Sequence, residues 1–414
     1  MKWKKRTQEE INSSVFSALS SNINYSSETI LGVPASYLDE KVFPNDNSFI
    51  KVSPFLSTLV QNPNHIGCHT IGESENFFKG TQQLERELIE ICAEDILNGS
   101  PSTFDGYITS GGTEANIQAI WVYRNYFQTE KNAKTHEIAV FCSQDSHYSM
   151  DKAANILGIE IYKVSTNDIT KKVEENHLKE LLEEAKNNGI LYYIVVVNMM
   201  TTMFGSVDNV EIYTANFISN KLEFKLHVDA AYGGFYYPFS NPETNLNFSN
   251  PHVCSVTLDA HKMAQAPYGT GIFLIRKGFI HYVTTKEASY IEGEDCTLIG
   301  SRSGANAIAV WMILSKYGPN GWFEKVFLLQ KRTDWLCEQL DALKLDYFRE
   351  PASNIVTIRS SSITNEIAAK YYLVPDNHHA ANWYKIVLMD HVTLDKLEPL
   401  IHDLKQHFSK PMVL

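Results

Sequence analysis

The chain has 414 residues, of which 44% are hydrophobic and 20% are charged, and its formal net charge at pH 7 is −12. This composition is ordinary for a globular protein and excludes the disordered and fibrous classes. The acidic balance argues against a nucleic-acid partner, because nucleic-acid binders need basic side chains to displace counterions from phosphates. The length predicts one large domain with a smaller one beside it.

The cysteines and the apolar runs of the sequence indicate the cellular compartment in which the protein is expected. Six cysteines are scattered without a Cys-x-x-Cys pair: Cys68, Cys92, Cys142, Cys254, Cys296 and Cys337. This usage favours reduced thiols over a disulfide framework or a zinc site. The longest apolar run, 190–197, is too short to span a bilayer, and residues 7–27 hold no apolar block of the signal-peptide type. We expect a cytoplasmic protein without a membrane partner.

Ahead of the first expected strand, the signals are weak. Residues 1–60 predict an amphipathic helix and then an irregular segment, and residues 62–80 predict a loop that lines a pocket. His65 and His69 have the i, i+4 spacing of metal ligands on a helix, but prolines and glycines nearby disfavour a helix, so we predict no metal. A helical pattern runs from Thr81 to an Asn-Gly-Ser-Pro turn.

Strand and helix patterns then alternate. The expected strands are 107–109, 137–142, 159–164, 190–197 and 224–228, and the expected helices are 113–127, 148–157, 176–187 and 211–222. This order predicts a mostly parallel, doubly wound α/β sheet. Ligands of such sheets bind outside the carboxyl ends of the strands, and the polar motifs of this chain follow strands.

Two motifs suit an anion and a flat ring. The string Ser-Gly-Gly-Thr-Glu-Ala-Asn at 110–116 opens a helix, where free N–H groups attract a phosphate, although an ordinary N-cap turn is the alternative. Asp229 and Ala231 end a buried strand on one face and could form a floor for a cationic ring. Lys262, in Asp-Ala-His-Lys-Met at 259–263, could supply an amine, although most lysines are solvated surface charges.

Together these motifs resemble those of the group II pyridoxal-phosphate-dependent amino-acid decarboxylases, the group that contains the aromatic amino-acid, histidine and glutamate decarboxylases. The short microbial tyrosine and aspartate decarboxylases are the most similar members, and the sphingosine-phosphate lyases are relatives. The resemblance extends over about residues 60–320. It implies fold type I of the pyridoxal-phosphate-dependent transferases, pyridoxal 5′-phosphate as the cofactor and a homodimer.

The resemblance also implies roles around the cofactor ring. Lys262, preceded by His261, would hold the cofactor aldehyde covalently, and Asp229 would pair with the pyridine nitrogen. His147 would stack on the ring face opposite Ala231, although a histidine at a strand end is more often a structural residue.

Further roles concern the phosphate and a neighbouring loop. Gly112 and Thr113 would bind the phosphate, with Asn116 as a weaker candidate. Thr202 would lie near the cofactor, and Asp208 would help to shape the site. The alternative for Asp208 is a cap for the next helix.

Three segments after Lys262 complete the expectations. The strand 269–276 contains Gly-x-Gly but lacks the third glycine of a dinucleotide fingerprint, which disfavours a nicotinamide-dependent oxidoreductase. A loop at 287–295 would cover the substrate, with Tyr290 as proton donor or as an ordinary surface tyrosine. Arg302 could bind a carboxylate or phosphate, or it could tie its helix to the large domain.

The remainder predicts a small α+β domain. Its expected helices are 322–343 and 394–408, and its expected strands are 354–359 and 385–389. The predicted division is an N-terminal segment, a large cofactor-binding domain and a small C-terminal domain, at 1–60, 61–300 and 301–414.

The expected reaction is decarboxylation of an L-amino acid to its amine and carbon dioxide, with Tyr290, Lys262 or His147 returning a proton to Cα. One alternative is a carbon–carbon lyase acting on a phosphorylated amino alcohol, for which only Arg302 offers a phosphate-binding cation. The other is a catalytically silent homologue that binds the cofactor, which the intact set of motifs disfavours.

Overall fold

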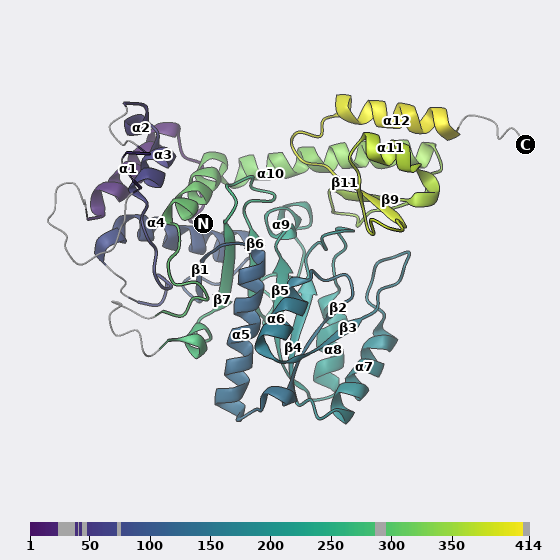
Figure 1. Ribbon diagram of the computed structural model, residues 1–414, viewed down its shortest axis with the longest axis horizontal. Coiled ribbons are helices and arrows are strands. Elements are labelled where there is room, and N and C mark those ends of the chain that lie inside the picture. Colours follow the sequence, from purple (N-terminus) through teal and green to yellow (C-terminus); the bar gives the residue numbers. More distant parts are fainter. Residues whose placement is uncertain (24–37, 40, 44–47, 73–75, 286–294, 409–414) are drawn as a thin grey trace, which may run out of the picture.

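A computed structural model describes residues 1–23, 38–39, 41–43, 48–72, 76–285 and 295–408. It consists of a large sheet flanked by helices, a group of N-terminal helices at one end and a small sheet at the other (Figure 1).

The large sheet has seven strands in the order β1-β7-β6-β5-β4-β2-β3. Their bounds are β1 Phe104–Thr109, β2 Ile138–Ser143, β3 Glu160–Val164, β4 Tyr192–Asn198, β5 Glu223–Ala230, β6 Val253–Asp259 and β7 Gly271–Arg276. Only β7 runs against its neighbours within this sheet. The predicted mostly parallel α/β sheet is therefore confirmed.

Both faces of this sheet are covered, which is why its central strands are apolar throughout. Along β2, Val140 faces one core together with α5 and α6, whereas Phe141 faces the other together with α7 and α8. These helices are α5 Gly112–Lys131, α6 Ser149–Leu157, α7 Glu175–Asn187 and α8 Val210–Ser219. The period of two in a strand thus separates the two cores.

The strand β6 was missing from the sequence-based prediction. Its apolar residues alternate with Ser255 and Thr257, which are fully buried. Both hydroxyls lie within hydrogen-bonding distance of the His227 ring, at 2.7 and 3.2 Å. Because these two buried residues are polar, β6 does not show the continuous apolar pattern by which the other strands were predicted.

The N-terminal region is more helical than predicted. Besides the expected helix α1 (Gln8–Ser21), it contains α2 (Ser48–Val52) and α3 (Pro54–Gln61), whose five and eight residues are too few for a clear period. Helix α4 (Lys79–Glu90) continues as the π-helical turn η2 (Ile91–Ile96).

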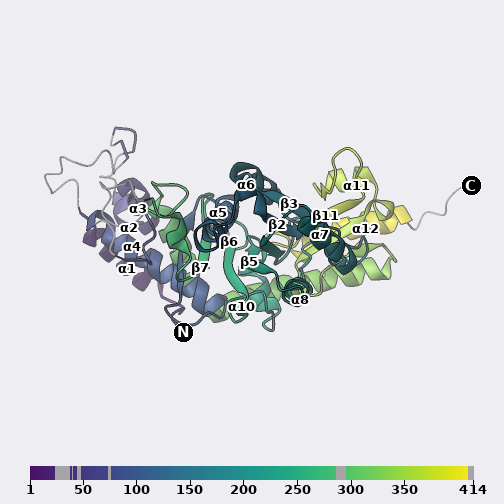
Figure 2. The ribbon, with the colours of Figure 1, turned by 90° about the horizontal axis from the view of Figure 1, so that it is seen from below.

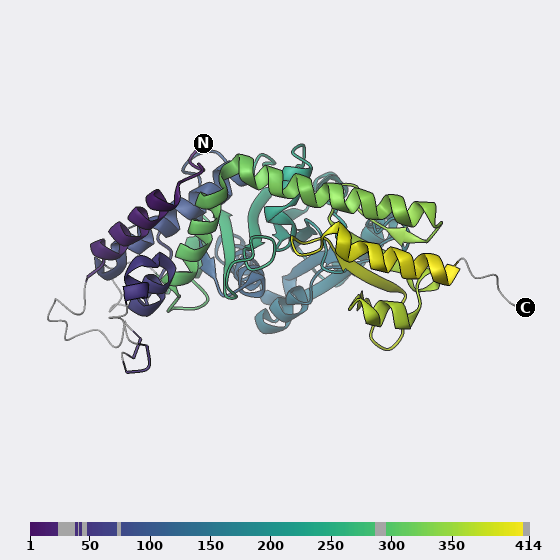
Figure 3. The same cartoon turned by 90° about the horizontal axis from the view of Figure 1, so that it is seen from above.

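Helix α10 (Gly304–Ala342) connects the two ends of the molecule (Figures 2 and 3). It bends at Gly318, whose φ of 62° is not helical. Its Trp311 belongs to the large core, whereas its Leu336 belongs to the core of the small sheet. The proposed domain boundaries remain a prediction, because this helix runs through both parts.

The small sheet has four strands in the order β10-β11-β9-β8. Its elements are β8 Tyr347–Phe348, β9 Ile355–Arg359, β10 Val374–Pro375, β11 Trp383–Val387, α11 Asn365–Lys370 and α12 Leu394–Phe408. Short helices elsewhere are η1 Asn76–Phe78, η3 Thr135–Glu137, η4 Gly233–Phe235, α9 Tyr237–Ser240, η5 Ile280–Val283 and η6 Ser360–Ser362. Within the described residues, no helix is long and apolar enough to cross a membrane.

Candidate active site

The carboxyl ends of β1, β2, β4, β5 and β6 border a cavity of about 290 Å³. The cavity brings together the described residues that were predicted to contact the cofactor, namely Gly112, Thr113, Asn116, His147, Thr202, Asp229, Ala231, His261 and Lys262. Tyr290 lies outside the described residues. Their roles toward the cofactor stay predictions, but their convergence is a structural fact.

The connection between β6 and β7 presents the Lys262 amine to the cavity. Its Nζ lies 3.1 Å from Oδ2 of Asp259, and the side chain is 32% exposed. Burial raises the pKa of Asp259, and Lys262 opposes that rise. Asp259 was not predicted as a site residue, although it stands three positions before the lysine, and it holds the amine at the cavity wall.

Asp229, at the end of β5, is held from two sides. Its Oδ1 accepts the N–H of Ala231 at 3.1 Å, and its Oδ2 accepts the side-chain amide of Asn116 at 2.9 Å. These two bonds fix the plane of a carboxylate that is only 6% exposed. A fixed, buried carboxylate suits pairing with a protonated ring nitrogen.

A buried chain of hydrogen bonds orients Asn116. Tyr123 donates to Ser255 Oγ, and Ser255 Oγ lies 2.7 Å from Nδ1 of His227. Nε2 of His227 lies 3.0 Å from Oδ1 of Asn116. Burial lowers the pKa of His227 to about 4, so the ring is neutral. Because Ser255 Oγ accepts from Tyr123, its own proton points to Nδ1, and the ring donates from Nε2. The amide nitrogen of Asn116 must then face Asp229, a link that the sequence motifs did not reveal.

His147 follows β2 and faces the cavity. Its Nδ1 lies 2.9 Å from Oγ of Ser149, which also accepts the Asn116 amide. Burial lowers the pKa of His147, against the opposing effect of Asp229. A neutral, oriented imidazole suits stacking on a cationic ring better than an imidazolium would.

The start of α5 forms a cradle beside this floor. The first N–H groups of a helix lack acceptors within the helix and attract anions. A Cβ on Gly112 would lie 2.8 Å from Oδ2 of Asp259 and 3.1 Å from Cβ of Ala231, so only glycine allows this approach. Anion-binding amides, a flat floor, a buried carboxylate and an amine fit the phosphate, ring, ring nitrogen and aldehyde of pyridoxal phosphate.

The loop after β4 closes another side of the cavity through Thr202. Asp208, near the end of this loop, accepts the backbone N–H and the side-chain amide of Asn198 at 2.8 and 2.7 Å. The helix that follows is capped instead by Asn209, whose side chain accepts the N–H of Glu211. Asp208 therefore holds Asn198, which lines the cavity, and is not the helix cap, while its role in shaping the site stays a prediction.

Arg302 is buried away from the cavity. Its guanidinium donates to Glu85 Oε1 at 2.6 Å and to the Ile108 carbonyl at 3.0 Å. Arg302 and His65 hold the pKa of Glu85 well below its usual range, although burial alone would raise it. Of the two open interpretations, the structure supports the tie between α10 and the large sheet.

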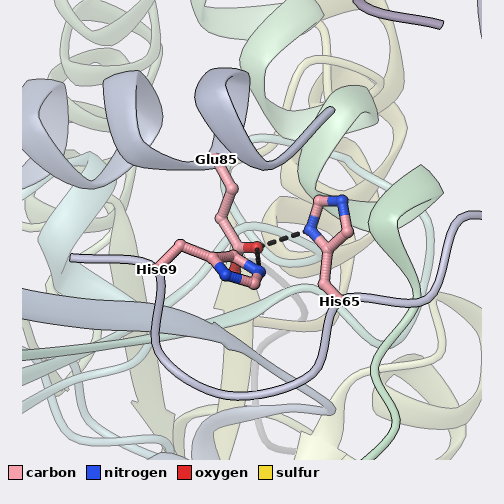
Figure 4. A group of neighbouring side chains, drawn as sticks. All are labelled: His65, His69 and Glu85. Carbon is pink, nitrogen blue, oxygen red and sulfur yellow. Dashed lines mark hydrogen bonds and ion pairs between the residues drawn. The ribbon is translucent and has the colours of Figure 1, made fainter. Parts of the chain in front are cut away.

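His65 and His69 lie in a loop that is not helical, and both side chains point toward the carboxylate of Glu85 (Figure 4). His65 Nδ1 lies 2.6 Å and His69 Nε2 lies 3.3 Å from Glu85 Oε2. These three side chains could hold a metal ion by position. However, the guanidinium of Arg302 on the same carboxylate repels a cation, and 2.6 Å is a hydrogen-bond distance. Neither histidine lines the 290 Å³ cavity. His69, Thr70 and Gly72 instead line a second cavity of about 240 Å³, so the predicted pocket-lining loop is confirmed.

Comparisons with known proteins agree with this geometry. The pyridoxal-dependent decarboxylase conserved domain matches residues 82–351. A tryptophan decarboxylase of Clostridium sporogenes is 52% identical over 409 residues, which cover 99% of this chain and 98% of that protein. A probable L-tyrosine/L-aspartate decarboxylase of Methanocella arvoryzae is 31% identical, covering 85% and 92%. The crystal structure of L-methionine decarboxylase from Streptomyces sp. 590 superposes with a TM-score of 0.69 at 22% identity, covering 83% and 87%.

Proposed function

Because this chain belongs to the pyridoxal-dependent decarboxylase family and is a pyridoxal-phosphate-dependent amino-acid decarboxylase, we propose that its substrate is L-tryptophan. The decarboxylase activity and the cofactor expected from the sequence are confirmed by these matches. The observation that carries the substrate proposal is the 52% identity to a tryptophan decarboxylase over nearly the whole of both chains.

The charges of the cavity support a substrate with an uncharged side chain. Among the described lining residues, Lys262 is the only lysine or arginine, and Asp259 already pairs with it. Arg302 is committed to Glu85. A second substrate carboxylate, or the phosphate of a phosphorylated amino alcohol, would therefore lack a cationic partner, and burying an unpaired charge is costly.

The residues of the cavity divide the work. Bound pyridoxal phosphate supplies an electron sink for the electron pair left when carbon dioxide departs. Lys262 would supply the amine that holds the cofactor aldehyde. Asp229 would keep the ring nitrogen protonated, and His147 and Ala231 would hold the ring. Lys262, His147 or Tyr290 then delivers a proton to the substrate Cα.

A panel of L-amino acids tests the proposal. The purified enzyme with added pyridoxal phosphate is given tryptophan, tyrosine, phenylalanine, methionine, aspartate or glutamate, and amine and carbon dioxide are measured. We expect kcat/KM for tryptophan to exceed that for aspartate and glutamate by about 100-fold or more, because each acidic side chain would leave a charge unpaired. Higher kcat/KM for aspartate, or turnover of sphingosine phosphate in place of amino acids, would refute it.

We also infer that the enzyme is a cytoplasmic homodimer. All six cysteines are unpaired thiols, which is typical of a reducing compartment. Tyr148 and Tyr268 are 58% and 89% exposed beside the cavity residues His147 and His261. Two large exposed rings beside residues of the same cavity support an interaction surface there.

A further inference from the structure

The loop 165–174, which joins β3 to α7, reaches toward the small sheet (Figure 1). It is tightly folded, because Asn167 donates its N–H to the Lys172 carbonyl at 2.8 Å and accepts the N–H of Lys171 at 2.9 Å. The backbone of Lys171 has a φ of 53°, which is unfavourable for residues other than glycine and asparagine. We refer to residues 165–174 as the latch loop.

The amine of Lys171 is buried between two parts of the protein. The residue is 6% exposed, and its Nζ lies 4.1 Å from the ring centre of Phe204 and 4.8 Å from that of Trp383. Its ion-pair partner is Asp168, at 3.0 Å. A buried amine is costly unless aromatic faces and a carboxylate compensate for lost water. Phe204 lies in the loop that carries Thr202, and Trp383 lies in β11.

Neighbouring charges of the latch loop reach the same two parts. Nζ of Lys172 lies 2.7 Å from Oε2 of Glu350, which precedes β9, and donates to the Val207 carbonyl at 3.2 Å. Asp168 pairs with Arg359 at the end of β9. The latch loop therefore holds the small sheet and the segment after β4 together.

The segment 201–206 is held between these contacts. A Cβ on Gly205 would lie 2.8 Å from Cβ of Ile355, so the segment packs directly on β9. The Thr202 carbonyl accepts Nζ of Lys385, in β11, at 2.9 Å. Thr202 lines the cavity, so a displacement of this segment would change the cavity wall.

We propose that Lys171 and Lys172 are positioning residues for the cofactor site, acting through Phe204 and Val207 of the segment after β4. With both amines in place, Thr202 is fixed against the cavity. Without either amine, the segment loses an anchor and the cofactor is held less firmly. The proposal depends on bound pyridoxal phosphate and is independent of which amino acid is the substrate.

The test compares the full-length holoenzyme with its Lys171→Met and Lys172→Met variants. The control is Lys179→Met, which removes the same charge from an exposed pair with Glu175 on α7. The readouts are the Kd of pyridoxal phosphate, the visible circular dichroism of the bound cofactor, and the thermal midpoint at saturating cofactor. We expect the Kd to rise about 2- to 30-fold in both variants and the dichroism to change, with no change in the control.

Lys171→Arg should restore the cofactor Kd, because arginine also binds aromatic faces and carboxylates. Lys172 is 44% exposed, so its variant is expected to fold and to carry the test if Lys171→Met does not. A Lys172→Met enzyme with the Kd and dichroism of the control would overturn the proposal. A lower thermal midpoint with an unchanged Kd would overturn it too, because that result shows a structural role only.

Discussion

At the scale of single residues, Asp229 depends on partners that lie far from it in the sequence. Its two oxygens are occupied by the Ala231 N–H and the Asn116 amide, and Asn116 is in turn oriented by His227. The carboxylate is thus fixed before any ligand enters. A fixed charge needs little reorganisation during a reaction, which is the condition under which it stabilises a transition state best.

The charge of Asp229 can be tested separately from its shape. Asp229→Asn keeps the size of the side chain but cannot hold a ring nitrogen in its protonated form, so kcat should fall by about 100-fold or more. Amine release under saturating substrate and cofactor measures the effect. Asp151→Asn, which removes an exposed carboxylate paired with Lys163, serves as control. Equal activity of the two variants would contradict the assigned role.

Asp208 should give the stability a defined pH dependence. Burial raises its pKa to about 6, from an ordinary value of 3.8, despite hydrogen bonds from Asn198. Between these pH values, the folded protein binds a proton that the unfolded chain has released, so the free energy of unfolding falls as pH rises and levels off above pH 6. A shift of about two pKa units corresponds to roughly 3 kcal/mol.

Asp208→Asn should remove this contribution. Urea unfolding at pH 4.5 and pH 7 should show the variant gaining stability relative to the wild type by about 2 kcal/mol at the higher pH, because this interval spans most of the titration. Other carboxylates titrate equally in both proteins and cancel in the comparison. A difference in unfolding free energy that stays constant across this range would show that Asp208 is not the titrating group.

The sequence predicted residues by motif but missed those that act through contact. Lys262, Asp229 and His147 follow strand ends, where a parallel sheet places ligands, so their convergence could be expected. Asp259 and His227 were missed, because their importance comes from distances of 3.1 Å to the amine and 3.0 Å to Asn116. Such pairings depend on strand order, which a single sequence does not specify.

At the scale of elements, predictability followed the strength of local patterns. The unbroken apolar run of β4 and the helical period of α7 were clear signals in the sequence. Helices α2 and α3 are too short to do so, and β6 carries buried hydroxyls. The antiparallel course of β7 also could not be read, because it depends on pairing with β1 from an early part of the chain.

The bend of α10 makes a prediction at this scale. Gly318 has a φ of 62°, and a Cβ there would lie 2.5 Å from the Lys5 nitrogen. Gly318→Ala should therefore destabilise the protein by about 1–3 kcal/mol in urea unfolding. At Gly321, in the same helix, a Cβ would meet only Tyr317 atoms at 3.8 Å, so Gly321→Ala should stabilise by about 0.5–1 kcal/mol. Equal effects would exclude the bend as the cause.

At the scale of the whole molecule, the exposed rings near the cavity predict association. Sedimentation equilibrium should give twice the mass of one chain, and Tyr268→Asp should shift the enzyme toward monomers by placing a charge in an apolar contact. Tyr372→Asp is the matched control, because Tyr372 is 91% exposed but lies between α11 and β10, whereas the Tyr268 ring lies beside the cavity residue His261. A monomeric wild type, or equal dissociation of both variants, would rule out this interface.

The strand order also has a consequence for synthesis on the ribosome. The strand β1 lies at the edge of the large sheet, and its sole neighbour there is β7. Phe104 therefore cannot pair with Arg276 until that residue has been translated. Until then a nascent chain exposes an apolar strand with unpaired amides, which is a site for chaperone binding and aggregation. Pairing across so long an interval also slows folding. Emergence of β7, rather than of the first strands, should therefore time the completion of the large sheet.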